Sequence, residues 1–140
     1  MAIKNVFEET RRLKADIENL SVAQLQAERA ANSELLLIDL REIQELIELG
    51  TIPGAHHVAR GMLEFWADPA SPYYRDFFSE DKRIVVFCAG GGRSVYATLA
   101  LREMGYSNVA HLESGFKGWR EEGGKVADFA ATSKWIKRPQ

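Results

Sequence analysis

The sequence predicts an α/β protein with a central, mainly parallel sheet and helices on both faces. Unbroken apolar runs at residues 35–38 and 84–87 are typical of parallel strands that are buried on both sides. Segments with the apolar spacing of helices lie between such runs, as in repeated strand–helix–strand units. The 140 residues suit one domain that is large enough to bury a core without disulfide bonds.

The first half of the chain alternates predicted helices and strands. Ser21 is suited to cap a helix, because its hydroxyl oxygen can accept from free N–H groups of the first turn. Gly50 ends a segment in which Ile43, Leu46 and Ile47 form a helical stripe. We therefore expect a helical extension at 4–15, packed on the domain or on a second subunit, an edge strand at 17–20, helices at 22–29 and 43–49, and strands at 35–38 and 55–58.

The segment 59–78 is rich in aromatic residues and less regular. We expect a short helix at 62–66 that stops near Pro69, and a second helix that starts with Ser71 as N-cap and Pro72 at the first helical position. The aromatic side chains either pack in the core or line a substrate pocket. Arg60 would offer such a pocket a positive charge.

The only cysteine, Cys88, lies between a buried strand at 84–87 and a helix that starts near Arg93. Three glycines, Gly90 to Gly92, let the backbone turn tightly and direct successive N–H groups into one concavity, which favours an anion. A helix N-terminus and a nearby arginine also favour a thiolate. The helix carries an apolar stripe of Ala97, Ala100, Leu101 and Met104, ends at Gly105, and leads to a strand at 109–112.

For the remaining polar residues, the sequence favours structural roles over catalytic ones. Asp39 and Arg41 follow the strand at 35–38. They would either belong to the site or form an ion pair and hydrogen bonds that hold the surrounding loops, and we expect the ion pair. No pair or group of histidines has metal-ligand spacing, because His56 and His57 are adjacent and point to opposite faces of a strand. We expect His111 to be a packed or edge residue, and no histidine to act as a catalytic base.

Composition excludes several classes of protein. The formal net charge is −2, from 18 basic and 20 acidic residues without a long run of one sign, so nothing indicates binding to nucleic acid or to an anionic membrane. One cysteine forms no internal disulfide. No apolar run reaches about 18 residues, and the N-terminus lacks a hydrophobic signal core, so we expect a cytoplasmic protein.

Four segments together resemble the rhodanese sulfurtransferase family. The loop CAGGGRS at 88–94 is similar to that family's C-x-x-G-x-R-S active-site loop. The other three are LLLIDLRE at 35–42, GTIPGAHHV at 50–58 and HLESGFKGWREEGGKV at 111–126, with Ser114 in place of the usual first glycine. The resemblance implies a rhodanese-like fold over residues 16–126, with an N-terminal helical extension at 1–15 and a C-terminal tail at 127–140 that carries Trp135 and Ile136.

The resemblance also implies a chemistry. Cys88 would take a sulfane sulfur from thiosulfate or a low-molecular-weight persulfide, hold it as a persulfide, and pass it to a thiol or cyanide-like nucleophile. The N–H groups of Ala89, Gly90, Gly91, Gly92, Arg93 and Ser94 would hold the terminal sulfur, and Arg93 would neutralise the anionic donor. No cofactor or metal is implied. The protein would be a monomer or homodimer, and the acceptor thiol would be small or belong to a partner protein.

Two alternatives stay open at this point. The first is a rhodanese-fold module for sulfur relay or partner binding, which keeps the chemistry of Cys88 but acts on a protein thiol. The second is a cysteine phosphatase with the pattern H-C-x5-R. That pattern fits poorly, because Phe87 precedes Cys88 and Arg93 comes five positions after it, where Ser94 occupies the sixth.

Overall fold

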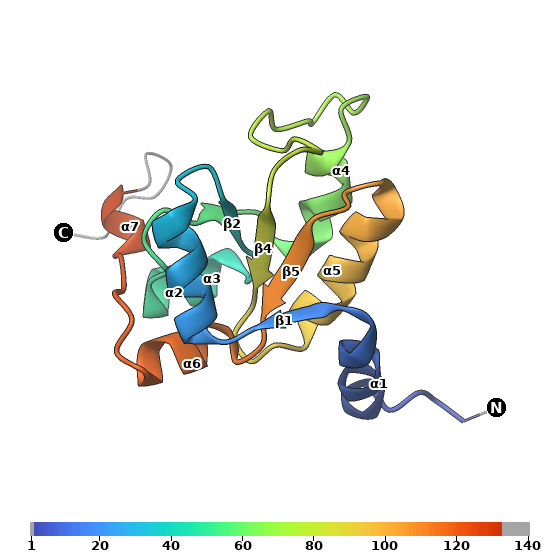
Figure 1. The fold of residues 1–140 in the computed structure, drawn as a ribbon, viewed down its shortest axis with the longest axis horizontal. Helices are drawn as coiled ribbons and strands as arrows, with labels where there is room; N and C mark the ends of the chain where they lie inside the picture. The colour runs from blue at the N-terminus through green and yellow to red at the C-terminus, as the bar shows by residue number, and fades with distance from the viewer. Residues whose placement is uncertain (1, 133–140) are drawn as a thin grey trace.

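One parallel sheet organises the structure, a computed structural model that describes residues 2–132. Within that range five strands lie in the order β1-β5-β4-β2-β3, and every neighbouring pair is parallel (Figure 1). The strands are β1 (Glu18–Leu20), β2 (Leu36–Asp39), β3 (His56–His57), β4 (Ile84–Phe87) and β5 (Val109–Leu112). The predicted α/β class with a mainly parallel central sheet is therefore confirmed.

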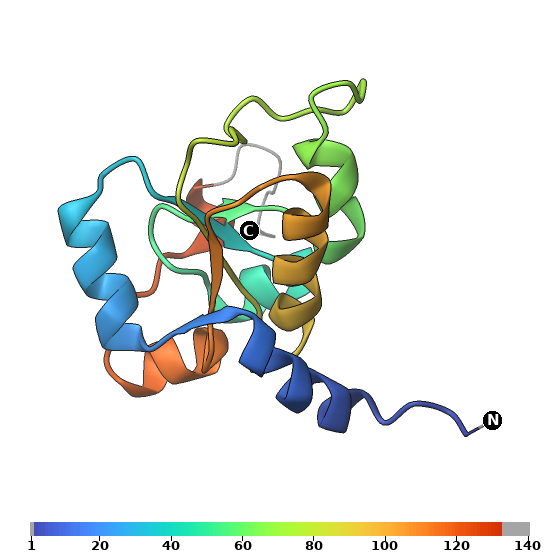
Figure 2. The same cartoon turned by 45° about the vertical axis from the view of Figure 1, so that its right-hand side comes forward.

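Helices cover both faces of this sheet, as Figures 1 and 2 show. Side chains of α2 and α6 pack in the core on one face, and side chains of α4 and α5 pack in the core on the other. The helices are α1 (Val6–Leu13), α2 (Val22–Ala31), α3 (Ile43–Leu49), α4 (Leu63–Ala67), α5 (Arg93–Met104), α6 (Gly115–Glu121) and α7 (Phe129–Thr132), with short 3₁₀ turns η1 (Lys14–Asp16) and η2 (Arg60–Met62).

The two central strands are buried along their whole length. All four residues of β2 and all four of β4 are shielded from solvent, because helices lie over both faces. The two strands pair in register from Leu36 with Ile84 to Asp39 with Phe87. Their carboxyl ends therefore meet at one edge of the sheet, where Cys88 follows β4 directly.

Caps and glycines set the helix boundaries much as the sequence predicts. The Ser21 hydroxyl accepts from the backbone N–H of Gln24, and the Gln24 side chain accepts from the backbone N–H of Ser21, which forms a capping box. Gly105 ends α5 with a φ of 113°, a left-handed conformation that a glycine adopts at little cost. The expected helix stripe of α5 is only partly buried: Ala97 and Leu101 face the core, while Met104 is exposed.

The predicted second helix at Ser71 and Pro72 is wrong. Residues 71–80 form a series of turns, in which the Ser71 hydroxyl accepts from the Tyr73 N–H and the Ser71 N–H donates to the Asp68 carbonyl. These local bonds satisfy the backbone without a helix. Several aromatic residues of the segment then pack against the core, namely Trp66, Tyr74, Phe77 and Phe78, whereas Phe65 and Tyr73 are exposed.

Asp39 and Arg41 form the predicted structural ion pair, and both are fully buried. One Asp39 oxygen accepts from the Arg41 backbone N–H and from its Nε, each at 3.0 Å, and the other accepts from Nη2 at 2.8 Å. Thr51 also donates to this carboxylate, and Arg41 donates to the Gly50 carbonyl. The pair therefore ties the end of β2 to the loop after α3.

The C-terminal segment is described as far as residue 132, so Trp135 and Ile136 of the predicted tail lie outside the described residues. The Thr51 and Ala127 backbones form an antiparallel bridge, which holds the start of this segment against the domain. Among residues 2–132, no helix has the length and apolar character needed to cross a membrane.

Candidate active site

Cys88 occupies the point where β4 ends and the glycine loop begins. Its side chain is only 1% exposed. The backbone N–H groups of Phe116 and Lys117, at the start of α6, donate to the carbonyls of Cys88 and Ala89 at 2.8 and 3.0 Å. The first turn of α6 therefore fixes the backbone on which the sulfur is mounted.

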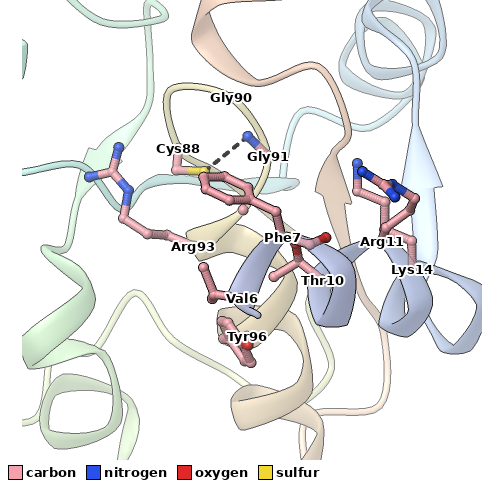
Figure 3. A pocket seen from close by; sticks show the side chains of 11 residues that line it. Val6, Phe7, Thr10, Arg11, Lys14, Cys88, Gly90, Gly91, Arg93 and Tyr96 are labelled. Carbon is pink, nitrogen blue, oxygen red and sulfur yellow. Dashed lines mark hydrogen bonds between the residues drawn. The ribbon is translucent and has the colours of Figure 1, made fainter. Parts of the chain in front are cut away.

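Gly91 brings a hydrogen-bond donor to the sulfur. Its N–H donates to Cys88 Sγ at 3.2 Å, as the dashed line in Figure 3 shows. The residue has a φ of 93°, and a Cβ atom there would collide with the Glu113 carbonyl oxygen. Glycine adopts this φ at little cost and has no Cβ atom to collide, so the geometry requires a glycine at position 91.

Positive electrostatic potential reaches the sulfur from two sources. The helix α5 starts at Arg93, so its N-terminal end lies beside the cysteine loop and favours negative charge. The Arg93 guanidinium also interacts with Cys88, but it forms a two-pronged ion pair with Glu45 at 2.9 and 3.0 Å. This hydrogen bonding lowers the pKa of Glu45 and raises that of Arg93. Part of the charge of Arg93 is thus compensated within the protein.

A cavity of about 510 Å³ opens over Cys88. The loop and the start of α5 form one wall, with Gly90, Gly91, Gly92, Arg93 and Tyr96, and the helix α1 forms the other (Figure 3). The α1 side chains in this wall are Val6, Phe7, Thr10 and Arg11, followed by Lys14 of η1. The N-terminal helix therefore packs on the domain itself, fastened to α5 by a hydrogen bond from the Tyr96 hydroxyl to Glu9.

The structure brings together most of the residues predicted for the site. Gly90, Gly91, Gly92 and Arg93 line the cavity beside Cys88. Ala89 lies in the same loop and Ser94 in the first turn of α5, but neither of them lines the cavity. Arg60 does not line the cavity either, and its guanidinium pairs with Glu64 at 2.7 Å. Its predicted role toward the substrate receives no support from this arrangement.

Behind the sulfur lies a buried polar chain that sequence reasoning missed. Cys88 Sγ is 3.6 Å from Ser94 Oγ, Ser94 Oγ is 2.8 Å from His111 Nδ1, and His111 Nε2 is 2.6 Å from Asn19 Oδ1. Strand register explains the meeting, because His111 on β5 pairs with Val86 on one side and with Asn19 on the other. The sequence feature that could have revealed these hydrogen bonds is His111, a polar residue within the predicted strand at 109–112.

Within residues 2–132, no group of three or more histidine, cysteine, aspartate or glutamate side chains is placed to hold a metal ion.

Arg93 and Glu45 are expected to affect anionic sulfur donors in opposite directions. Replacing Arg93 with alanine removes a cation beside the sulfur, so the KM for an anionic donor should rise by roughly tenfold, or about 1.4 kcal/mol, and the KM for a neutral donor much less. Glu45→Gln frees Arg93 from its ion pair and should lower the KM for the anionic donor. Steady-state rates with both donors measure these values. The same ratio of the two KM values in all three proteins would refute the assigned role of Arg93.

Comparison with known proteins assigns the chain to a family. The family model of the rhodanese-like domain matches residues 21–122, which is well over half of the chain. The chain therefore belongs to the rhodanese-like domain family.

Individual relatives agree with this assignment. The Bacillus subtilis (strain 168) protein named "Putative sulfurtransferase YtwF" is 34% identical over 107 residues, which cover 76% of this chain and 94% of that protein. A Rhodopseudomonas palustris structure, named as a protein of unknown function and possible tyrosine phosphatase, is 38% identical with a TM-score of 0.83, and the match covers 91% of this chain and 97% of that one. The polysulfide-sulfur transferase homodimer of Wolinella succinogenes is 29% identical, with a TM-score of 0.69 and coverage of 86% and 85%.

Proposed function

We propose that this protein is a sulfurtransferase that carries sulfane sulfur on Cys88. It takes the sulfur from thiosulfate or a low-molecular-weight persulfide and passes it to a thiol or cyanide-like nucleophile. The observation that carries the proposal is the position of the Cys88 sulfur, which faces a cavity at the N-terminus of α5 and accepts from the Gly91 N–H. The names of the B. subtilis and W. succinogenes relatives support the same chemistry.

The transfer takes place in two displacements at sulfur. In the first, the Cys88 thiolate attacks the outer sulfur of the donor, and sulfite or a thiolate leaves with the electron pair of the broken bond. In the second, the acceptor attacks the outer sulfur of the Cys88 persulfide, and Cys88 leaves as a thiolate. Electrons balance within each step, so no external oxidant or reductant is required. The Gly91 N–H and the end of α5 stabilise the negative sulfur in both states.

The cavity favours an organic persulfide over thiosulfate among these donors. Its volume of about 510 Å³ falls within the range of about 300–1,000 Å³ that is typical of pockets for drug-sized ligands. Val6 and Phe7 supply apolar surface for the organic part. Arg11 and Lys14 have no ion-pair partner within residues 2–132, so their charges are available to a carboxylate on the donor.

Arg11 is expected to discriminate between donors. Arg11→Gln should raise the KM for glutathione persulfide, an organic persulfide with carboxylates, by roughly tenfold, or about 1.4 kcal/mol of binding. The KM for thiosulfate should change much less, because this small donor reaches Cys88 without contacting α1. Steady-state rates with cyanide as acceptor measure both values.

Arg12→Gln provides the matched control for this variant. Arg12 is exposed on the same helix but does not line the cavity, so this change should leave both KM values as they are. Equal losses for both donors, or equal effects of the two substitutions, would refute the assigned role of Arg11. Absence of thiocyanate formation from either donor in the wild type would refute the sulfurtransferase function itself.

A phosphatase is the competing proposal, since the R. palustris relative is named as a possible tyrosine phosphatase. The loop from Cys88 to Arg93 is one residue shorter than the H-C-x5-R pattern, and Phe87 stands where that pattern has histidine. In addition, the Arg93 guanidinium forms an ion pair with Glu45, so it is not free to bind a phosphate group alone. The geometry therefore favours a single sulfur atom over a tetrahedral phosphate group.

A further inference from the structure

The hydrogen bonds that lead from Cys88 through Ser94 and His111 to Asn19 have a defined donor and acceptor at each step, and the partners of Asn19 determine which is which. Asn19 Nδ2 donates to the carbonyls of Lys14 and Ile17 at 2.9 and 3.1 Å, so Asn19 Oδ1 faces His111 as an acceptor. His111 must therefore carry its proton on Nε2 in the neutral state. Its bare Nδ1 then accepts the Ser94 hydroxyl proton, and Ser94 offers only an oxygen lone pair to the Cys88 thiol.

Each link of this chain is shielded from solvent or nearly so. Cys88 is 1% exposed, Ser94 and His111 are fully buried, and Asn19 is half-buried. A proton that leaves the sulfur on this side meets Ser94 instead of water. Neither Ser94 nor His111 lines the cavity in which a donor would bind.

We propose that Ser94 and His111 form a proton relay that takes the thiol proton of Cys88 as the nucleophile is formed. The S–H proton moves to Ser94 Oγ while the Ser94 hydroxyl proton moves to His111 Nδ1. Two protons shift and no heavy atom has to move. The Cys88–Ser94 and Ser94–His111 hydrogen bonds reverse their direction, while His111 Nε2–H continues to donate to Asn19 Oδ1. The thiolate then accepts from both the Gly91 N–H and the Ser94 hydroxyl, and Asn19 Oδ1 holds the imidazolium. His111 is thus a positioning residue that acts through Ser94.

The surroundings of His111 keep the imidazole in its neutral form, which leaves Nδ1 free to accept from Ser94. Burial, and to a smaller extent the charge of Lys14, lower the pKa of His111 to about 4, so the ring is neutral at physiological pH. Among the described residues, the charged groups recorded next to these side chains are Lys14 of η1, which acts on His111, and Arg93 with its partner Glu45, near the sulfur. The proton returns through Ser94 to the sulfur when Cys88 leaves as a thiolate.

Asn19→Asp tests the relay, because a relay and a simple charge effect predict opposite results. A carboxylate on His111 Nε2 stabilises the imidazolium, so through the relay it should raise the rate of Cys88 alkylation at pH 5.5 by about tenfold. A carboxylate that acts on the sulfur only through space disfavours the thiolate and should lower that rate. The double variant Asn19→Asp/Ser94→Ala, in which the relay is cut, should lose the gain.

Ser21→Asp is the matched control, since it adds a carboxylate on the same segment, retains a good N-cap residue and does not contact His111. It should leave the alkylation profile unchanged. An unchanged or lowered rate in Asn19→Asp, or a gain that survives Ser94→Ala, would overturn the relay.

Nitrogen-15 NMR of the wild type supplies a test that requires no folded variant at Asn19, with His111→Gln used only to assign the signal. The relay requires a protonated Nε2 and a bare Nδ1 at pH 7, and a protonated Nδ1 would overturn it. Although the inference concerns the cysteine of the proposed function, both readouts are independent of sulfur transfer. Failure of one proposal is therefore distinguishable from failure of the other.

Discussion

Cys88→Ser should abolish sulfur transfer while leaving the fold intact. A serine hydroxyl does not ionise near neutral pH and cannot form the persulfide, so turnover should fall by at least about a thousandfold with any donor. The hydroxyl can still accept from the Gly91 N–H and donate to Ser94, and we therefore expect the free energy of unfolding to change by about 1 kcal/mol or less. Thiocyanate formation and urea unfolding measure the two effects.

The comparison with unfolding data excludes a trivial loss of activity. A Cys88→Ser protein with wild-type stability and no turnover locates the defect in the chemistry. Substantial turnover in the folded variant would mean that another group performs the transfer, because the chain contains no second cysteine.

Asp39→Ala should cause the largest loss of stability. It leaves the Arg41 guanidinium fully buried without its carboxylate, a situation that typically costs about 3–5 kcal/mol of unfolding free energy. The substitution should also disturb the active site, since the Leu40 N–H donates to the carbonyl of Phe87, the residue directly before Cys88. Urea unfolding of the variant and the wild type measures the difference.

Two further variants test whether the loss of stability comes from the buried ion pair. Thr51→Val removes one hydrogen bond to the same carboxylate and should cost about 1.5–3 kcal/mol, which is informative even when Asp39→Ala does not fold. Glu64→Ala breaks the exposed pair with Arg60 and should cost at most about 1 kcal/mol. If the Asp39 and Glu64 variants lose similar amounts, the buried pair does not have the structural role assigned to it.

The sheet and the cysteine loop were predictable because local patterns encode them. The runs at 35–38 and 84–87 permit few alternatives to buried parallel strands, and the glycines after Cys88 specify a tight loop before a helix. The pairing of Asp39 with Arg41 was also predictable, since their spacing at a strand end places both in the same loop.

Features that depend on distant contacts were not predictable. The α1 wall of the cavity arises because Glu9 meets Tyr96, residues far apart in the chain, and the amphipathic pattern of 4–15 does not say what the helix covers. The relay arises only once β5 lies between β1 and β4, which brings Asn19 and Ser94 to either side of His111. The incorrect prediction of a helix at Ser71 has a different cause. A good N-cap residue followed by proline can also begin an irregular turn, as it does here.

Intact-protein mass spectrometry of Cys88 after brief incubation with a sulfur donor tests the central claim most directly. Wild-type protein treated with glutathione persulfide or thiosulfate should gain the mass of one sulfur atom, and cyanide should remove it with formation of thiocyanate. Cys88→Ser should gain nothing under the same conditions. A wild-type protein that gains no sulfur from either donor, or a Cys88→Ser protein that gains one, would contradict a persulfide cycle on this cysteine.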